Sequence, residues 1–382
     1  MTTAGRGCVF AVWIACVAWS AAATAVACPF CGVVGRSLAD RRDTAQAFAV
    51  GEAAAPPAND AAGFAAQRFR IDQVLRGDEN MVGTVVSARV EGPVAGTALL
   101  FSAGDPERWT AIPANEPVLG HAVAAPPMSA PEAERLRWFA RRLEHPEAAI
   151  AADAFTEFGL APFEAVRAAA DAFDPRLLRG WLLEPAIDQR RRGFYGLALG
   201  IVASRSADPV EAAACRDALR RAIEAPADDF RAGFDGLLAG LLVAEGPRGL
   251  DWLEGRGLFG RSARPVDQRH LLSALRFAWE SLADSIPRHR VEAATAKLLS
   301  SPVVAADATI DLARYRSWEA VDDVARLWDE LGADDPLVRR AVAGYLSACP
   351  QPAAREQLDR IRRTSPVLLE QAIKAATLPA AR

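Results

Sequence analysis

The fold of this chain is decided by the stretch Gly193-Phe194-Tyr195-Gly196-Leu197-Ala198-Leu199-Gly200. It returns about 40 residues later as Gly233-Phe234-Asp235-Gly236-Leu237-Leu238-Ala239-Gly240, with all three glycines, the phenylalanine and the first leucine in place. A period of this length is typical of helical hairpins that stack on copies of themselves, because one hairpin cannot bury its apolar face alone. The repeat therefore predicts an array of helix pairs.

A second pair of segments supports the same period. The stretch 152–158 resembles 306–312, and the stretch 163–166 that follows the first resembles 318–321. Both matches are separated by about 154 residues, close to four times the shorter offset. Two independent matches thus agree on one spacing. They favour a stacked array over the alternative, a plain helical bundle.

Composition limits the class of protein. The chain has 382 residues, of which 51% are hydrophobic and 24% charged, and this excludes a disordered protein. The formal net charge of −4 gives no basic excess that would favour nucleic acid as a partner. Apolar residues recur three and four apart from Glu132 onward. We therefore expect a mainly α fold, with about six helix pairs and about fourteen helices over residues 132–380.

The N-terminal part of the chain differs from the helical part in composition and in hydrophobic pattern. Residues 28–121 are rich in glycine, proline and β-branched residues, and their apolar positions tend to alternate. The expected strands are about 45–52, 67–75, 83–91, 97–102 and 107–112. Five short strands in this length predict a small all-β barrel or sandwich. Three prolines in residues 122–131 predict an extended linker to the helical part.

The first 27 residues read as a secretory signal peptide. Arg6 precedes an apolar run, and the small residues that follow end in Ala25-Val26-Ala27, a typical cleavage site. The alternatives are an uncleaved membrane anchor, or a lipid on Cys28, although Ala25 stands where lipoprotein signals usually have leucine. No later segment has 18 uninterrupted apolar residues, so no further membrane span is expected. The protein is predicted to be periplasmic or secreted.

The sharpest local motif is Cys28-Pro29-Phe30-Cys31. Two cysteines at this spacing close readily into a disulfide, and they also permit thiol–disulfide exchange. A redox pair usually follows a strand and opens a helix, whereas here the mature chain would begin at Cys28. We therefore favour a structural disulfide, with redox chemistry as an alternative. The metal interpretation lacks further ligands, since no second CxxC is present.

Other candidate residues have structural interpretations. Cys215 and Cys349 fall in expected helices and are predicted to be buried free thiols. The glycines at 196, 200, 236 and 240 predict close helix contact, with a backbone cradle for a ligand as the alternative. The histidines are expected at the surface or at helix ends; they are His121, His145, His270 and His289.

The carboxylates and tryptophans of the helical region are also expected to have structural rather than catalytic or binding roles. Asp153 and Glu157 recur as Asp307 and Asp311, and such a periodic pair is expected to cap a helix or to bond arginines of a neighbouring repeat, rather than to act as a general acid and base. Tryptophans spread among leucine and alanine are expected in the core rather than on a sugar-binding platform; they are Trp138, Trp181, Trp252, Trp279, Trp318 and Trp328.

Two segments carry family resemblances. The stretch 335–346, with its Asp-Pro start and Val338-Arg339 pair, resembles the first helix of a HEAT repeat, which implies a HEAT-like α-solenoid over residues 132–380. The cysteine pair followed by 68–77 resembles netrin-like modules, which implies an OB-like barrel. Those modules usually carry further cysteines, and none stands between Cys31 and Cys215. The whole layout resembles secreted bacterial HEAT-like repeat proteins.

These observations predict a noncatalytic, extracytoplasmic protein-binding scaffold with a protein partner. No catalytic residue, cofactor or metal is assigned, and nucleic acid is not an expected partner. Two alternatives stay open: a thiol–disulfide oxidoreductase or maturation factor that uses Cys28 and Cys31, and a polysaccharide-binding module.

Overall fold

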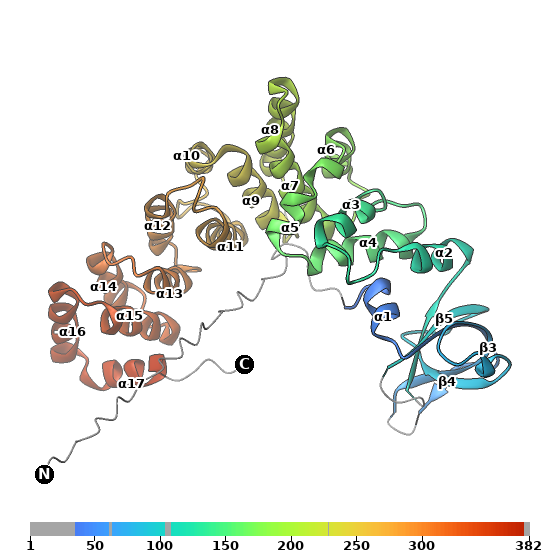
Figure 1. The fold of residues 1–382 in the computed structure, drawn as a ribbon. Coiled ribbons are helices and arrows are strands. Elements are labelled where there is room, and N and C mark those ends of the chain that lie inside the picture. Colours follow the sequence, from blue (N-terminus) through green and yellow to red (C-terminus); the bar gives the residue numbers. More distant parts are fainter. Residues whose placement is uncertain (1–34, 61–62, 104–107, 228, 378–382) are drawn as a thin grey trace, which may run out of the picture.

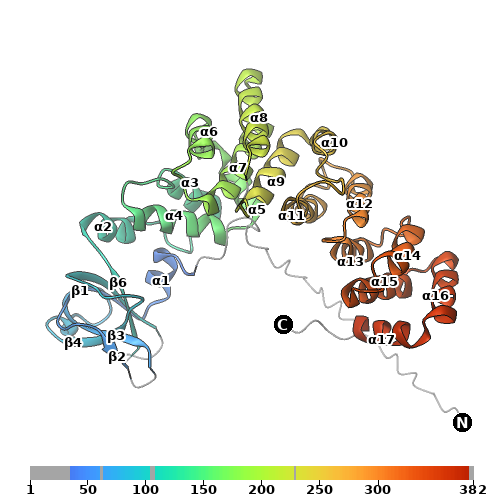
Figure 2. The same cartoon turned by 180° about the vertical axis from the view of Figure 1, so that it is seen from behind.

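The protein is an arch of stacked helices with a small β module at one end (Figure 1). The computed structural model describes residues 35–60, 63–103, 108–227 and 229–377. Figure 2 shows the same arch from behind, with the β module again set apart from the last helix, α17. The predicted class, mainly α with a small N-terminal β module, is confirmed.

The β module is a closed barrel. Its strands are β1 (Ala47–Ala53), β2 (Ala58–Asn59), β3 (Ala65–Arg76), β4 (Val85–Arg89), β5 (Thr97–Ser102) and β6 (Trp109–Pro113), with a 3-10 turn at Glu79–Met81. The sheet order is β1-β5-β6-β4-β3-β2, and β1 also pairs with β3, which closes five strands into a ring. This is a Greek-key barrel of the OB-like kind. Each of the five predicted strands is present, with ends shifted by up to two residues.

Helices fill the rest of the described chain. They are α1 (Leu38–Thr44), α2 (Glu116–Ala124), α3 (Glu132–Ala140), α4 (Ala148–Leu160), α5 (Phe163–Ala168), α6 (Pro175–Leu183), α7 (Gln189–Arg205), α8 (Pro209–Glu224), α9 (Phe234–Glu245), α10 (Pro247–Gly255), α11 (Pro265–Ser281), α12 (Arg288–Lys297), α13 (Ala305–Tyr315), α14 (Val321–Glu330), α15 (Pro336–Ala348), α16 (Pro352–Thr364) and α17 (Pro366–Thr377). Short 3-10 turns follow α5 and α12, at Ala170–Ala172 and Leu298–Ser300. From α9 to α17, odd-numbered helices line the inner side of the arch and even-numbered ones the outer side (Figure 1).

Several helices begin at an Asp-Pro dipeptide, as the sequence predicts. The side chains of Asp174, Asp208 and Asp335 each accept a hydrogen bond from a backbone N–H in the first turn. The proline that follows has no N–H to leave unpaired at this position. Local chemistry therefore fixes where α6, α8 and α15 start.

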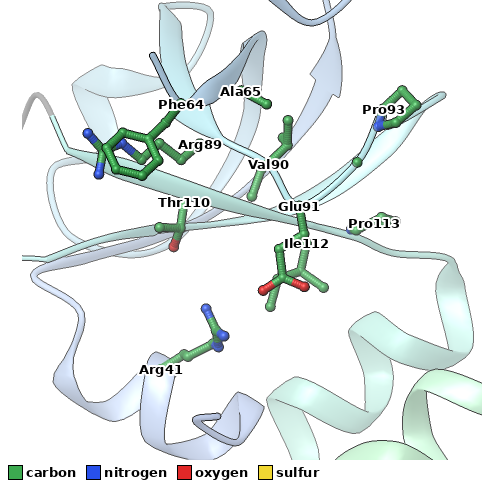
Figure 3. A pocket seen from close by; sticks show the side chains of 12 residues that line it. Arg41, Phe64, Ala65, Arg89, Val90, Glu91, Pro93, Thr110, Ile112 and Pro113 are labelled. Carbon is green, nitrogen blue, oxygen red and sulfur yellow. The ribbon is translucent and has the colours of Figure 1, made fainter. Parts of the chain in front are cut away.

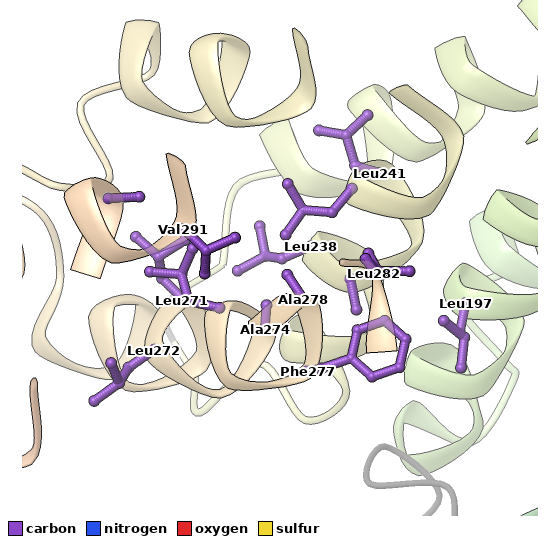
Figure 4. Close-up of a cluster of buried hydrophobic side chains, with 14 of the residues drawn as sticks. Leu197, Leu238, Leu241, Leu271, Leu272, Ala274, Phe277, Ala278, Leu282 and Val291 are labelled. Carbon is purple, nitrogen blue, oxygen red and sulfur yellow. The ribbon is translucent and has the colours of Figure 1, made fainter. Parts of the chain in front are cut away.

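The core runs continuously along the array. Leucine, alanine and phenylalanine side chains from α7, α9, α11 and α12 interlock, and each interface passes into the next (Figure 4). The tightest contact joins α7 and α9, where a Cβ built on Gly200 would overlap the carbonyl oxygen of Gly240. A Cβ on Gly240 would in turn overlap the carbonyl oxygen of Gly196. The predicted close helix contact at these glycines is confirmed.

The expected linker is instead a packed junction. Residues 122–124 belong to α2, and Ala122 and Ala125 are buried. Arg42 of α1 donates hydrogen bonds to the carbonyls of Ala122 and Ala125, at 2.9 and 2.7 Å. These carbonyls end a helix and have no partner within it, so the guanidinium caps them. The prediction of an extended stretch over all of 122–131 is therefore wrong, because a distant arginine satisfies its backbone.

Candidate functional site

A concave site among the described residues is a groove on the β module. It encloses about 560 Å³ between α1 and the neighbouring strands β4 and β6 (Figure 3). Its lining includes Val90, Pro93, Thr110, Ile112 and Pro113. We refer to it as the barrel groove. Its volume is in the range of pockets that hold small ligands or short peptide segments.

The groove exists because β4 ends early. β4 and β6 pair in parallel only through Ala88 with Trp109 and Arg89 with Thr110. On the other side, β6 pairs with β5 as far as Pro113. The last three residues of β6 therefore continue beyond the end of their β4 partner. A strand edge left open in this way exposes backbone groups that another strand can bond.

Two arginines and one glutamate stand around the barrel groove (Figure 3). Arg89 lies over the ring of Phe64, 4.1 Å from its centroid, and pairs with Asp60 at 3.0 Å. Arg41 donates from Nε to the carbonyl of Arg36 at 3.3 Å, and among the described residues it has no carboxylate partner. Its charge is therefore available to a ligand in the groove.

A second polar cluster lies buried where the β module meets the helices. Asp153 of α4 accepts a hydrogen bond from the N–H of Leu38 at 2.7 Å and contacts Nε2 of His121 at 2.8 Å. The side chains of Asp153 and His121 are 5% and 2% exposed. Because solvent and substrate cannot reach this cluster, it joins the two parts of the molecule rather than forming an active site.

Glu157 lies one helical turn after Asp153 and is bonded by Arg135 of α3. Burial raises the pKa of the Glu157 carboxyl, against the opposing effects of Ser37 and Arg135. Asp311 holds the corresponding position in α13 and pairs with Arg276 of α11 at 2.6 Å. The predicted pairing with an arginine of a preceding helix is confirmed for Glu157, Asp307 and Asp311. Among the described residues, Asp153 has no arginine partner and instead accepts from the Leu38 N–H at the start of α1.

The histidine prediction is wrong for His270, which lies inside α11, whereas His121 lies in the last turn of α2 as expected but is also buried. His121 is 5% exposed and His270 is 7% exposed. Nε2 of His270 lies 3.0 Å from the Phe230 carbonyl, and its other ring nitrogen lies 3.7 Å from Asp235. Burial lowers the pKa of His270, but these two acceptors outweigh burial and raise the pKa above its usual value. The sequence pattern missed them because their partners lie about 30 to 40 residues away.

The cysteines divide into two groups. Cys215 and Cys349 are buried and free, as predicted. Burial raises the pKa of the Cys215 thiol, which disfavours the reactive thiolate. Cys28 and Cys31 lie before the first described residue, and so does the predicted signal peptide. Their predicted roles therefore remain predictions.

The tryptophans pack as predicted. Trp328 is buried within the helical core, and the other five of the predicted set are partly buried against it. Trp279 stacks on Tyr315 with the ring centroids 4.2 Å apart. Trp318 meets Tyr345 edge-on at 5.1 Å. These contacts join neighbouring repeats, and the rings are part of the packed core.

Sequence reasoning missed the barrel groove. Arg41, Glu91 and Thr110 stand far apart along the chain, and no short motif connects them. The available signal was the proline in Gly92-Pro93, which ends β4 early.

Over the residues that the structure describes, no helix is long and apolar enough to cross a membrane, and no group of three or more histidine, cysteine or acidic residues could hold a metal ion. No protein-family model matches the chain, and no curated protein resembles it.

Proposed function

We propose that this protein is a noncatalytic binding scaffold that works outside the cytoplasm and holds a protein partner. The arch of stacked helix pairs is the observation that supports it most directly (Figure 1). Repeat arrays of this kind present an extended concave surface whose curvature follows from small rotations between repeats. Such a surface suits a macromolecular partner better than a small molecule.

The polar interior supports the same proposal. Buried carboxylates at Glu157, Asp267 and Asp311 each bond an arginine from a preceding segment, and these pairs hold successive helices together. The charges of these carboxylates are compensated by arginines within the stack of helices. The repeat spacing and the capped Asp335-Pro336 start support the assignment of the helices to the HEAT-like type.

The extracytoplasmic location rests on residues 1–27. We expect a fusion of these residues to alkaline phosphatase to be active in the periplasm, and the mature protein to begin at Cys28. N-terminal sequencing of the protein purified from the envelope checks both the cleavage and a lipid on Cys28. An uncleaved cytoplasmic product would contradict this part of the proposal.

Photocrosslinking tests the scaffold itself. A photoreactive phenylalanine replaces Ile310, which is 44% exposed on inner helix α13, in the full chain inside cells that express it. The matched control carries the same group at Ala293, an exposed residue of outer helix α12. A discrete adduct with another protein from position 310 alone supports a partner on the inner side. Equal adducts from both positions, or none from either, would contradict it.

A further inference from the structure

We propose that the barrel groove binds an extended, mainly apolar segment of a partner protein, with a carboxylate of that segment against Arg41. This deepens the proposed function and rests on it, because it names a second contact for a protein partner. The groove and the inner side of the arch are separate surfaces, so each can be tested without the other.

The strand edge supplies the first part of the argument. β6 continues to Pro113 while β4 stops pairing at Arg89, so the backbone groups of Ala111 and Pro113 that point away from β5 face the groove. An extended peptide can add to such an edge through backbone hydrogen bonds, and side-chain pockets then supply specificity. A compact small ligand would leave this edge unused.

The groove walls supply the second part. Pro93 and Pro113 stand at one end, and Ile112 projects into the groove between them and α1 (Figure 3). Prolines have no N–H to pair, and their rings offer apolar contact without a competing donor. Apolar side chains at alternate positions of a bound strand would cover these residues.

The charged side chains that line the groove determine which ligand charge it favours. The Arg41 guanidinium points from α1 toward the groove, and among the described residues it has no carboxylate partner. Glu91 is exposed and also lines the groove, and its carboxylate lies on the same side of the strands as Arg41 (Figure 3), where it repels a polyanion such as nucleic acid. A single carboxylate bonded to Arg41 brings only one negative charge near Glu91, whereas a polyanion brings many. The pair therefore favours an acidic residue within an apolar segment.

A competing occupant is residues 28–34 of this chain, which directly precede the first described residue. Seven residues span about 23 Å when extended, and the segment leads into α1, which carries the groove residue Arg41. Their sequence, Cys-Pro-Phe-Cys-Gly-Val-Val, contains no carboxylate for Arg41. The charge therefore favours a partner segment, and self-occupancy becomes an outcome of the test.

Selection from a random library of linear 12-residue peptides on the full-length protein tests the proposal. We expect enriched peptides to carry Asp or Glu among β-branched or aromatic residues. A synthetic copy of the strongest family should bind at least tenfold more weakly to Arg41→Glu, measured by fluorescence polarisation. Thr110→Trp, which fills the groove, should also weaken it. Arg68→Glu, an exposed arginine of β3 outside the groove, should leave binding unchanged.

Three outcomes would overturn the proposal. The first is a library that yields no enriched peptide, and the second is binding that tolerates both Arg41→Glu and Thr110→Trp. In the third, replacing residues 28–34 by a Gly-Ser stretch raises peptide affinity tenfold, which would assign the groove to the chain's own segment. If the adduct from position 310 forms while any of these holds, the scaffold function stands and only the groove proposal fails.

Discussion

Most buried carboxylates of the array pair with arginines from earlier segments, and Asp311 has a second arginine, Arg314, at 3.6 Å. The Asp311 side chain is fully buried, and burial raises the pKa of its carboxyl despite the nearby Arg276. Removing one member of a buried pair leaves the other charge without compensation, which is more costly than losing both. Comparing single and double substitutions therefore separates the energy of the pair from the effects of its surroundings.

Arg276→Gln should lower the free energy of unfolding by about 2 kcal/mol, less than for a fully buried pair because the arginine is over a third exposed. Adding Asp311→Asn to this variant should recover part of the loss, since a neutral amide costs less to bury. Urea denaturation of the single and double variants measures the difference. A double variant less stable than Arg276→Gln alone would contradict the pairing.

His270 should make stability depend on pH. Because the folded pKa is raised, the stabilisation is complete below the unfolded value of about 6.5 and is lost as pH rises through the folded pKa. The protonated ring faces Asp235, the Phe230 carbonyl and, further away, Asp267. Urea denaturation from pH 5.5 to 8.5 should show the parent losing stability relative to His270→Gln. The exposed His289→Gln variant should follow the parent, and an unchanged difference across this range would contradict the assignment.

At the scale of elements, the glycines set the distance between α7 and α9. Both helices are hydrophobic and buried over most of their length, so they belong to the interior of the array. Glycine inside a helix costs about 1 kcal/mol relative to alanine. Here the cost is offset because the two backbones can approach closely enough for dense packing.

Gly200→Ala should destabilise the protein by about 3 kcal/mol or more, since the new methyl group would collide with the Gly240 backbone and push the helices apart. The matched control is Gly180→Ala in α6, where a Cβ meets open space. That variant should gain about 0.5–1 kcal/mol from helix propensity alone. Thermal denaturation of both variants checks the contrast, and equal effects would exclude close packing as the reason for the glycines.

At the scale of the whole molecule, the junction determines whether the β module and the array unfold together. Leu38 of α1 and Ile150 of α4 belong to one apolar cluster that covers the outside of the barrel. Asp153 and Arg42 add hydrogen bonds across the same boundary. A boundary with both apolar contacts and hydrogen-bonded polar groups makes the two parts unfold together.

Asp153→Leu should separate their unfolding. It removes the acceptor for the Leu38 N–H and the partner of His121, at a cost of about 3 kcal/mol. Calorimetry should show one transition for the parent and two for the variant. Asp153→Asn, which keeps an acceptor oxygen for Leu38, should lose about 1 kcal/mol and retain a single transition. Two transitions in the parent itself would show that the junction does not couple the parts.

Much of the local structure follows from the sequence, because it depends on neighbours along the chain. Alternating apolar residues placed the strands, Asp-Pro dipeptides placed helix starts, and the glycine repeat indicated the contact between α7 and α9. The burial of His121 and His270 did not follow, since their partners Asp153 and Asp235 come from other segments.

The sequence by itself thus determined the fold class, the repeat and the two-part order of the chain, because periodicity and turn chemistry are local. Tertiary structure alone decided that residues 122–125 are packed rather than extended, because Arg42 reaches their carbonyls from 80 or more positions away. It also decided that Arg41 and Glu91 share one groove beside an open strand edge. A strand edge and the charges beside it come together only when the barrel closes. No local sequence pattern predicts where the pairing of β4 with β6 ends.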